Sequence, residues 1–244
     1  MSGHSHAKTI KHQKNITDQK RGQMFSKMAR VISVAVKQGG PNPETNTKLK
    51  VAIEQAKEFN MPKENIERAI KQASGEAEGV NLEEIILEAY GPGGIAIIIE
   101  GVTDNRNRTL GAVKQILNQG GGKLAQEGSV RWMFERKGAV TINCGLQAEN
   151  LQNKEDLELK AIEAGAEDIY RYDDAFDVYT KVEYLENVKK NLENQGVKIE
   201  GASLDWVPKE EIILEEKDKA TCQKLFDALD ENDDVQEIYS NLKV

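Results

Sequence analysis

The sequence contains little of what most metalloproteins, secreted domains and acid–base enzymes use. It has two cysteines, Cys144 and Cys222, and its three histidines all lie within residues 4–12. Two cysteines so far apart form neither a disulfide framework nor a zinc-ligand spacing, so we expect reduced thiols and a cytoplasmic location. No histidine remains elsewhere to act as a general base, so we expect no catalytic residue and no enzyme.

Long apolar runs are also absent. The run at residues 95–99 is among the longest, whereas a membrane-spanning helix needs about 20 apolar residues. The N-terminus has basic residues but no apolar stretch of a secretory signal. We therefore expect no membrane partner, and the composition is that of a globular protein with one large domain or two to three small ones.

What the chain does have is an uneven distribution of charge. Residues 1–75 contain 14 Lys and Arg but only six Asp and Glu, a net charge of +8. Because the whole chain carries −8, residues 76–244 carry −16. A basic segment on an acidic protein points to an anionic partner, such as nucleic acid.

Residues 1–78 are predicted to form a basic arm followed by three helices. The arm, residues 2–16, has no clear apolar period. From Asp18 onward apolar residues recur at helical spacing, and glycine and proline near residues 39–41, 62 and 75 separate three short helices. On the first helix four basic residues fall away from the apolar stripe and are expected to face solvent: Lys20, Lys27, Arg30 and Lys37. Arg21 is expected near that stripe.

Beyond residue 79 the apolar period changes to two, which indicates strands. Strands are predicted at residues 82–90, 95–102 and 130–134, with a helix near residues 110–117 before the third strand. Residues 138–204 follow the order β-α-β-β-α-β of a ferredoxin-like unit, and the last of these strands is predicted at residues 197–204.

The C-terminal tail is predicted as strand, helix and strand, and it cannot bury its helix alone. The sheet of residues 82–134 lacks a second helix, so we expect the tail to pair with it. The predicted fold class is α+β with three domains. These are the arm and helical bundle at residues 1–78, a discontinuous α/β domain at residues 79–136 plus 205–244, and an inserted ferredoxin-like α/β domain at residues 137–204.

Three other segments could hold a ligand. The glycine-rich loop at residues 90–94 lies between two strands and lacks a following Lys-Ser or Lys-Thr pair, so a hairpin turn is favoured over a phosphate-binding loop. Residues 103–109 join a strand to a helix start, where Arg106 and Arg108 could hold a phosphate. The alternative is that Asn107 or Thr109 caps the helix and the arginines pair with nearby acids. If Met1 is removed, Ser2-Gly3-His4 could bind Cu(II) or Ni(II) through square-planar nitrogen ligands, but nothing supplies a second shell, so we expect no metal and no cofactor.

Several motifs occur together in an order and spacing that resemble the YebC/PmpR family, which also includes mitochondrial translational activators. They are Gly3-His4-Ser5, Ile10-Lys11-His12, Lys20-Arg21-Gly22, the segment at residues 60–70, Tyr90-Gly91-Pro92-Gly93-Gly94, residues 103–109, Gly121-Gly122, Gly128-Ser129-Val130 and Met133-Phe134-Glu135. The resemblance covers the whole chain and implies three domains and a cytoplasmic, non-catalytic regulator of gene expression. The family arm commonly continues with Lys-Trp, whereas this chain has His6 and Ala7, so its contact is expected to be electrostatic.

The resemblance leaves open which nucleic acid is bound. One reading is a DNA-binding transcriptional regulator. Another is a ribosome-associated factor that binds rRNA and relieves stalling at difficult, proline-rich sequences. A third, of another class, is a protein-interaction or small-ligand-sensing module. For the first two we predict phosphate contacts by Lys8, Lys11, Lys14, Lys20, Arg21, Lys27, Arg30, Arg106 and Arg108. The oligomeric state stays open between a monomer and a weak dimer.

Overall fold

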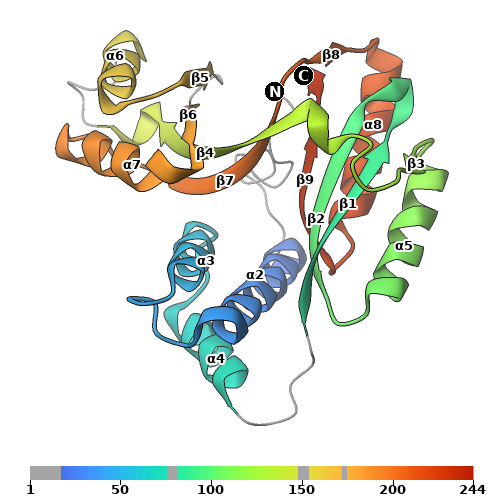
Figure 1. Ribbon diagram of the computed structural model, residues 1–244, viewed down its shortest axis with the longest axis horizontal. Helices are drawn as coiled ribbons and strands as arrows, with labels where there is room; N and C mark the ends of the chain where they lie inside the picture. Colours follow the sequence, from blue (N-terminus) through green and yellow to red (C-terminus); the bar gives the residue numbers. More distant parts are fainter. Residues whose placement is uncertain (1–17, 76–81, 148–153, 172–174, 244) are drawn as a thin grey trace. The chain divides into compact units, whose positions relative to one another are not determined.

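A computed structural model describes residues 18–75, 82–147, 154–171 and 175–243 (Figure 1). The chain divides into two compact units, one of residues 1–135 with 206–244 and one of residues 136–205. Both divisions fall inside strands, β4 (Phe134–Asn143) and β7 (Gly201–Pro208). The structure is mixed α and β, as predicted, while the residue limits of three separate domains stay a prediction.

The helical part of the first unit consists of α2 (Asp18–Gly39), α3 (Thr47–Glu58) and α4 (Lys63–Ser74). Its core is made by the apolar stripes that the 3.6-residue period predicted, including Ile32 and Leu49, both fully buried. Asn46 caps α3 by accepting a hydrogen bond from the Leu49 amide at 3.0 Å, and its side-chain amide donates to the Ala35 carbonyl at 2.7 Å. This one residue therefore fixes both the start of α3 and its position against α2.

The remainder of the first unit is a four-stranded sheet in the order β3-β1-β2-β9. β1 (Glu83–Tyr90) and β2 (Ala96–Thr103) form the predicted hairpin, and β9 (Val235–Ser240), from the C-terminal tail, pairs antiparallel with β2. The helices α5 (Arg106–Gln119) and α8 (Glu216–Asp230) cover one face of this sheet (Figure 1). The tail thus supplies the second helix that the sheet of residues 82–134 was expected to need. Two short strands, β8 (Ile212–Ile213) and β10 (Leu242–Lys243), pair in parallel.

The opposite face of this sheet is covered by the segment that follows α5. The predicted strand at residues 130–134 is wrong: β3 is the short pair Lys123–Leu124, and Arg131–Met133 is a turn of 3-10 helix, η2. Val130 and Phe134 are buried against the sheet, whereas Trp132 is 65% exposed. The alternation that suggested a strand arises here from a tight helical turn that buries the residues on either side of it.

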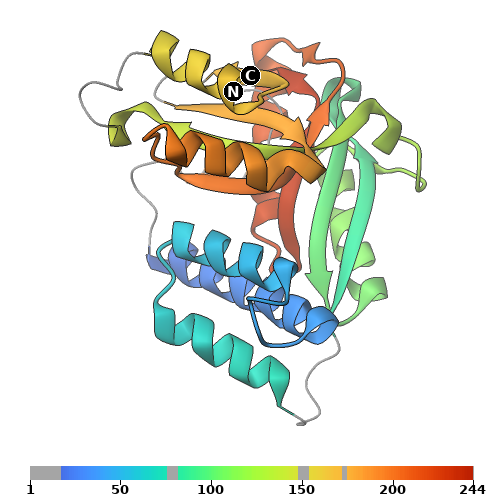
Figure 2. The same ribbon diagram turned by 60° about the vertical axis from the view of Figure 1, so that its left-hand side comes forward.

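The second unit has the predicted ferredoxin-like order, β4, α6 (Lys154–Ala164), β5 (Asp168–Arg171), β6 (Ala175–Lys181), α7 (Leu185–Asn194) and β7. The strands are arranged β5-β6-β4-β7, with β6 antiparallel to both β4 and β5. Both helices lie on the same face of this sheet (Figures 1 and 2). Val140 of β4 and Val178 of β6 are among the side chains beneath them. The last strand begins at Gly201, later than the predicted residue 197.

Candidate nucleic-acid interface

The basic residues predicted for the arm are described only in part. Lys8, Lys11 and Lys14 lie outside the described residues, and so does the side chain of Lys20 in the first turn of α2. Arg21, one residue further, is exposed rather than held at the apolar stripe. The described part of the predicted interface therefore begins at Arg21.

Lys27 does not face solvent as predicted. Its side chain is only 2% exposed, and its ammonium group donates to the carbonyl oxygen of Asp230 at 2.6 Å and to the Asp230 carboxylate at 2.8 Å. Gln23, one turn earlier, donates to the carbonyl oxygen of Glu231 at 2.8 Å. The polar side of α2 is thus covered by the end of α8 and the loop that leads to β9, which the helical period of α2 alone could not show.

Arg30 and Arg108, predicted as parts of two separate patches, meet at one carboxylate. Arg30 donates to Oδ1 of Asp234, while Arg108 donates to Oδ2 of the same residue at 3.0 Å. Thr109 donates to the same Oδ2 at 2.6 Å. Arg30 is about a third exposed, and its guanidinium group is held by Asp234 rather than directed freely toward solvent. After Lys27, Arg30 is thus the second residue whose predicted solvent-facing position is corrected.

The surroundings of Asp234 keep it ionised. Its side chain is 8% exposed, and burial on its own raises the pKa of this carboxyl group. The hydrogen bonds from Thr109, Arg30 and Arg108 outweigh burial, so that the pKa lies below its ordinary value. Asp234 therefore holds α2, the β2–α5 loop and the α8–β9 loop together as a carboxylate that is ionised at neutral pH.

The start of α5 is capped by a residue other than the two considered from sequence. The side chain of Asn105, not Asn107 or Thr109, accepts the hydrogen bond from the Arg108 amide, at 3.1 Å. Arg108 also pairs with Asp104 at 2.5 Å, so this arginine does pair with nearby acids. Arg106 differs from it, since it is exposed and forms no ion pair within the described part of the chain.

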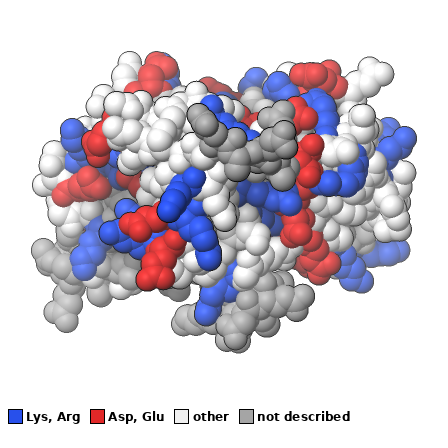
Figure 3. Space-filling model, turned by 90° about the horizontal axis from the view of Figure 1, so that it is seen from below, with Lys and Arg blue, Asp and Glu red and all other residues white. Residues whose placement is uncertain are grey.

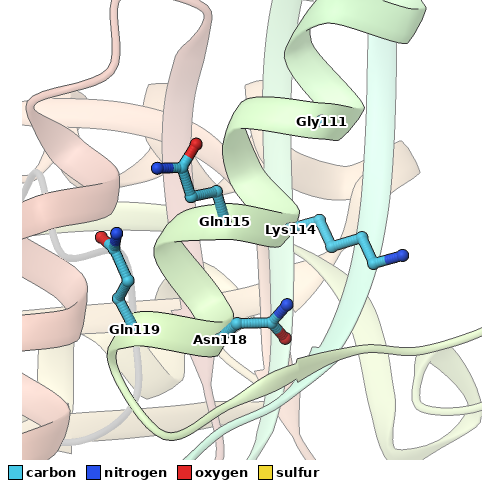
Figure 4. A pocket seen from close by; sticks show the side chains of 5 residues that line it. All are labelled: Gly111, Lys114, Gln115, Asn118 and Gln119. Atoms are coloured by element: carbon cyan, nitrogen blue, oxygen red, sulfur yellow. The ribbon is translucent and has the colours of Figure 1, made fainter.

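The solvent-facing side of α5, beyond Arg106 and Arg108, is also polar. Residues 105–126 include no Asp or Glu, which is unusual because they lie within residues 76–244, which carry −16 overall. A shallow hollow of about 370 Å³ lies along the helix, and Figure 4 shows the four polar side chains projecting around it. It is lined by Gly111, Lys114, Gln115, Asn118 and Gln119. Amide groups both donate and accept, so this face can bind phosphate oxygens and hydroxyl groups alike.

Sequence reasoning missed a further charged residue, Glu88. The carboxylate of Glu88 is buried in β1 and accepts backbone hydrogen bonds from Gly128, Val130 and Arg131 at 2.7, 2.7 and 2.9 Å. Burial raises the pKa of Glu88, but these three bonds and the charge of Arg131 lower it further than burial raises it. A glutamate in the middle of an otherwise apolar strand was the available signal, although its partners lie about 40 residues away.

The two cysteines, Cys144 and Cys222, are the remaining candidates for a nucleophile. Both are free and buried, and burial raises the pKa of the Cys222 thiol to about 11. A thiol with so high a pKa is protonated at neutral pH and is a poor nucleophile. Among the described residues, no group of three or more His, Cys, Asp or Glu side chains could hold a metal ion.

On the face seen in Figure 3, basic side chains lie beside acidic ones at several places. None of the helices in the described ranges has the length and apolar character needed to cross a bilayer.

Comparison with known proteins gives matches over almost the whole chain. Residues 5–76 match a family model described as the TACO1/YebC protein N-terminal domain, and residues 82–242 match one described as the TACO1/YebC second and third domain. A protein of Dehalococcoides mccartyi named a probable transcriptional regulatory protein is 48% identical over 241 residues, covering 99% of this chain and 94% of the relative. A protein of Halothermothrix orenii with the same name is 44% identical over 245 residues, covering 100% and 96%.

A solved structure is similar as well. The crystal structure of a conserved hypothetical protein from Aquifex aeolicus superimposes with a TM-score of 0.86 at 46% sequence identity. The similarity covers 96% of this chain and 95% of that one.

Proposed function

Because this chain belongs to the TACO1/YebC family, whose relatives are named as probable transcriptional regulators, we propose that it is a non-enzymatic, cytoplasmic regulator that binds nucleic acid. The observation that carries the proposal is the charge of +8 on residues 1–75 against −16 on the remainder. Duplex DNA at a regulated gene is the first candidate ligand, in keeping with the names of the relatives.

In this proposal the phosphate contacts come from the arm and from the exposed cations next to it. Lys8, Lys11, Lys14, Lys20 and Arg21 form the main set, and Arg106 joins them from the start of α5. Contacts of this kind release counterions, so binding is independent of base sequence and weakens steeply with salt. The acidic remainder of the chain repels phosphate, which limits the phosphate contacts to the basic residues.

The paired cations have a different part in the proposal. Lys27, Arg30 and Arg108 are positioning residues, because their charges are already balanced by Asp104, Asp230 and Asp234. They hold α2, which carries Arg21, beside the β2–α5 loop, which leads to Arg106. Substitution of these three residues should therefore disturb the packing of α2 against the β2–α5 loop rather than remove a phosphate contact directly.

A second candidate, a ribosome-associated translation factor that binds rRNA, is supported by how α2 is used. A helix that reads DNA bases needs a free polar face to enter the major groove. The polar stripe of α2 that bears Gln23, Lys27 and Arg30 is instead covered by the α8–β9 loop. Backbone contact to a structured RNA requires no such face.

Charge reversal tests the shared part of the proposal. We expect Lys11→Glu with Lys20→Glu to weaken binding to DNA and to ribosomes, and to reduce the slope of log K against log salt by roughly one unit for each DNA phosphate that is no longer neutralised. The matched control is Lys57→Glu with Lys71→Glu, which makes the same charge change at exposed positions of α3 and α4. An equal decrease in both variants would show general charge rather than an interface, and unchanged binding in the first variant would refute the proposal.

A salt titration separates the two candidates. The full chain is titrated against promoter DNA, random DNA and purified ribosomes over a range of salt concentrations. Preference for promoter over random DNA supports the transcriptional candidate. Tight, saturable binding to ribosomes with only salt-sensitive, sequence-independent binding to DNA supports the translational one. Crosslinking that returns proteins and no nucleic acid would favour the third reading, a protein-interaction module.

A further inference from the structure

Trp132 is the largest apolar side chain exposed in the described part of the chain, with 65% of its surface accessible. A tryptophan is seldom left so open, because burying its ring is strongly favourable. The polar atom of the ring is already satisfied, since Nε1 donates to the carbonyl oxygen of Ser129 at 2.9 Å. The ring therefore offers only its apolar π surface to a partner.

The loop that carries Trp132, residues 125–133 between β3 and β4, is held in place by several hydrogen bonds. The buried Glu88 carboxylate binds the amides of Gly128, Val130 and Arg131, so three amides of this loop are tied to one strand. The Tyr90 hydroxyl donates to the Ser129 carbonyl oxygen at 3.2 Å, the same oxygen that Trp132 uses. A ring held in this way loses little conformational freedom on binding.

The neighbours of Trp132 in the chain are oriented in the opposite direction. Val130 is fully buried and Phe134 is 4% exposed, and both pack against the sheet. Core formation therefore uses the apolar residues on each side of Trp132 and leaves this one outside. Gln126, Glu127 and Gly128, earlier in the same loop, are exposed and are not apolar.

This isolation argues against a protein partner. The centre of a protein–protein interface is a cluster of apolar side chains surrounded by a polar rim, and the Trp132 loop exposes a single ring. Stacking on a nucleobase needs only one ring face, and every base supplies such a face. Duplex DNA keeps its bases inside the helix, whereas RNA loops and bulges present unpaired bases that stack on aromatic side chains.

We propose that Trp132 is a stacking platform for an unpaired base of RNA. This inference rests on the second candidate of the proposed function, RNA binding, in which the phosphate contacts of the basic arm would bring the strand to the protein. It adds a contact that is insensitive to salt to a set of contacts that salt weakens. It also places the aromatic contribution in the Trp132 loop, in a chain whose arm has Ala7 and therefore relies on charge.

Substitution of the ring tests the stacking contact. Binding of a single-stranded adenosine RNA is measured for the native chain, Trp132→Ala and Trp132→Phe. Stacking contributes about 1–3 kcal/mol per base, so we expect Trp132→Ala to weaken binding by about 5- to 150-fold and Trp132→Phe to retain most of the affinity. A duplex DNA of the same length should be bound equally by all three proteins, and the weaker binding of RNA by Trp132→Ala should persist at high salt.

Fluorescence reports the contact directly, because the chain has only two tryptophans, Trp132 and Trp206. In Trp206→Phe the emission comes from Trp132 alone. We expect adenosine RNA to quench it, and an abasic strand with the same phosphates to bind with little quenching. Thermal unfolding of each variant shows whether the fold is intact, which an exposed position favours.

The outcomes separate this inference from the function on which it rests. If the native chain binds RNA but Trp132→Ala binds it equally well and emission is unchanged, the stacking platform is wrong and the regulator proposal stands. If the native chain binds neither RNA nor DNA, both fail. A crosslinker at position 132 that captures protein in place of RNA would also overturn the stacking platform.

Discussion

The ammonium group of Lys27 and the Asp230 carboxylate form an ion pair at 2.8 Å between residues 203 positions apart in the chain. Only 2% of the Lys27 side chain is exposed, against 19% for Asp230. If one partner is removed, water can therefore solvate the remaining Asp230 carboxylate more easily than the remaining Lys27 ammonium group. Because of this difference, the pair tests whether α2 is bound to the end of α8.

We expect Asp230→Ala to destabilise the protein by about 3 kcal/mol, because it leaves a buried ammonium group with one acceptor. Lys27→Met should cost less, since the Asp230 carboxylate is partly hydrated and the methionine fills the same space. Urea unfolding of both variants and of the double variant measures the coupling. The control pair, Lys63 and Glu67, is exposed at 86% and 63%, so its removal should cost under about 1 kcal/mol. Equal costs for the two pairs would contradict the buried contact.

A second prediction concerns pH and Glu88. Because the pKa of Glu88 is lower in the folded chain than its ordinary value of 4.5, the ionised carboxylate stabilises the fold above that pH. This contribution is lost as the pH falls from 4.5 through the folded pKa. We expect Glu88→Gln to lower the free energy of unfolding by about 1–3 kcal/mol at pH 7 and by progressively less below about pH 4.5.

The control for Glu88 is Glu83→Gln, an exposed position on the same strand, which should change little at any pH. Chemical unfolding at several pH values supplies the comparison. A difference between native and Glu88→Gln that stays constant from about pH 7 to about pH 3 would show that ionisation of Glu88 has no part in holding the 128–131 loop.

A third prediction is that a substitution at Gly111 raises the stability of the protein. A Cβ atom added at this position in α5 would meet nothing within 4 Å. Glycine inside a helix costs about 1 kcal/mol relative to alanine, so Gly111→Ala should stabilise the protein by up to that amount. Gly101→Ala is the contrast, because its Cβ atom would collide with the backbone of Asp234. Thermal unfolding of both variants measures the two effects.

If the hollow on α5 is also a nucleic-acid contact, Gly111→Ala should weaken binding while raising stability. A glycine that costs stability without serving internal packing is consistent with close approach of a partner. If Gly111→Ala binds nucleic acid as tightly as the native chain, the α5 face is not part of the interface. The proposed contacts of the arm would not be affected by that result.

A fourth prediction concerns Asp234→Asn. This substitution removes the negative charge that balances Arg30 and Arg108. We expect the variant to be less stable than the native chain, yet to bind nucleic acid more tightly at low salt and with a steeper salt dependence, because Arg30 loses its acidic partner and Arg108 keeps only Asp104. Asp233→Asn, at the neighbouring position, is the control of equal charge. Identical binding by the two variants would show that only net charge matters.

Local patterns in the sequence were enough to predict the helices of the basic segment and the ferredoxin-like order of the second unit. In both, the apolar period directly reflects which face is buried, as at Ile32 and Val178. The burial of Lys27 could not be predicted in the same way, because it depends on Asp230, the last residue of α8, 203 positions later in the chain. The strand expected at residues 130–134 failed for a related reason, since alternation of buried and exposed residues also fits a single 3-10 turn.

The position of β9 at the end of the chain sets an order for synthesis on the ribosome. The sheet of the first unit lacks β9 until residues 235–240 have been made, whereas residues 136–205 form a unit from contiguous sequence. A nascent chain can therefore complete its second unit before its first. Until then Lys27 and Arg30 lack Asp230 and Asp234, so these two basic residues of α2 gain their acidic partners only when the C-terminal part of the chain has been made.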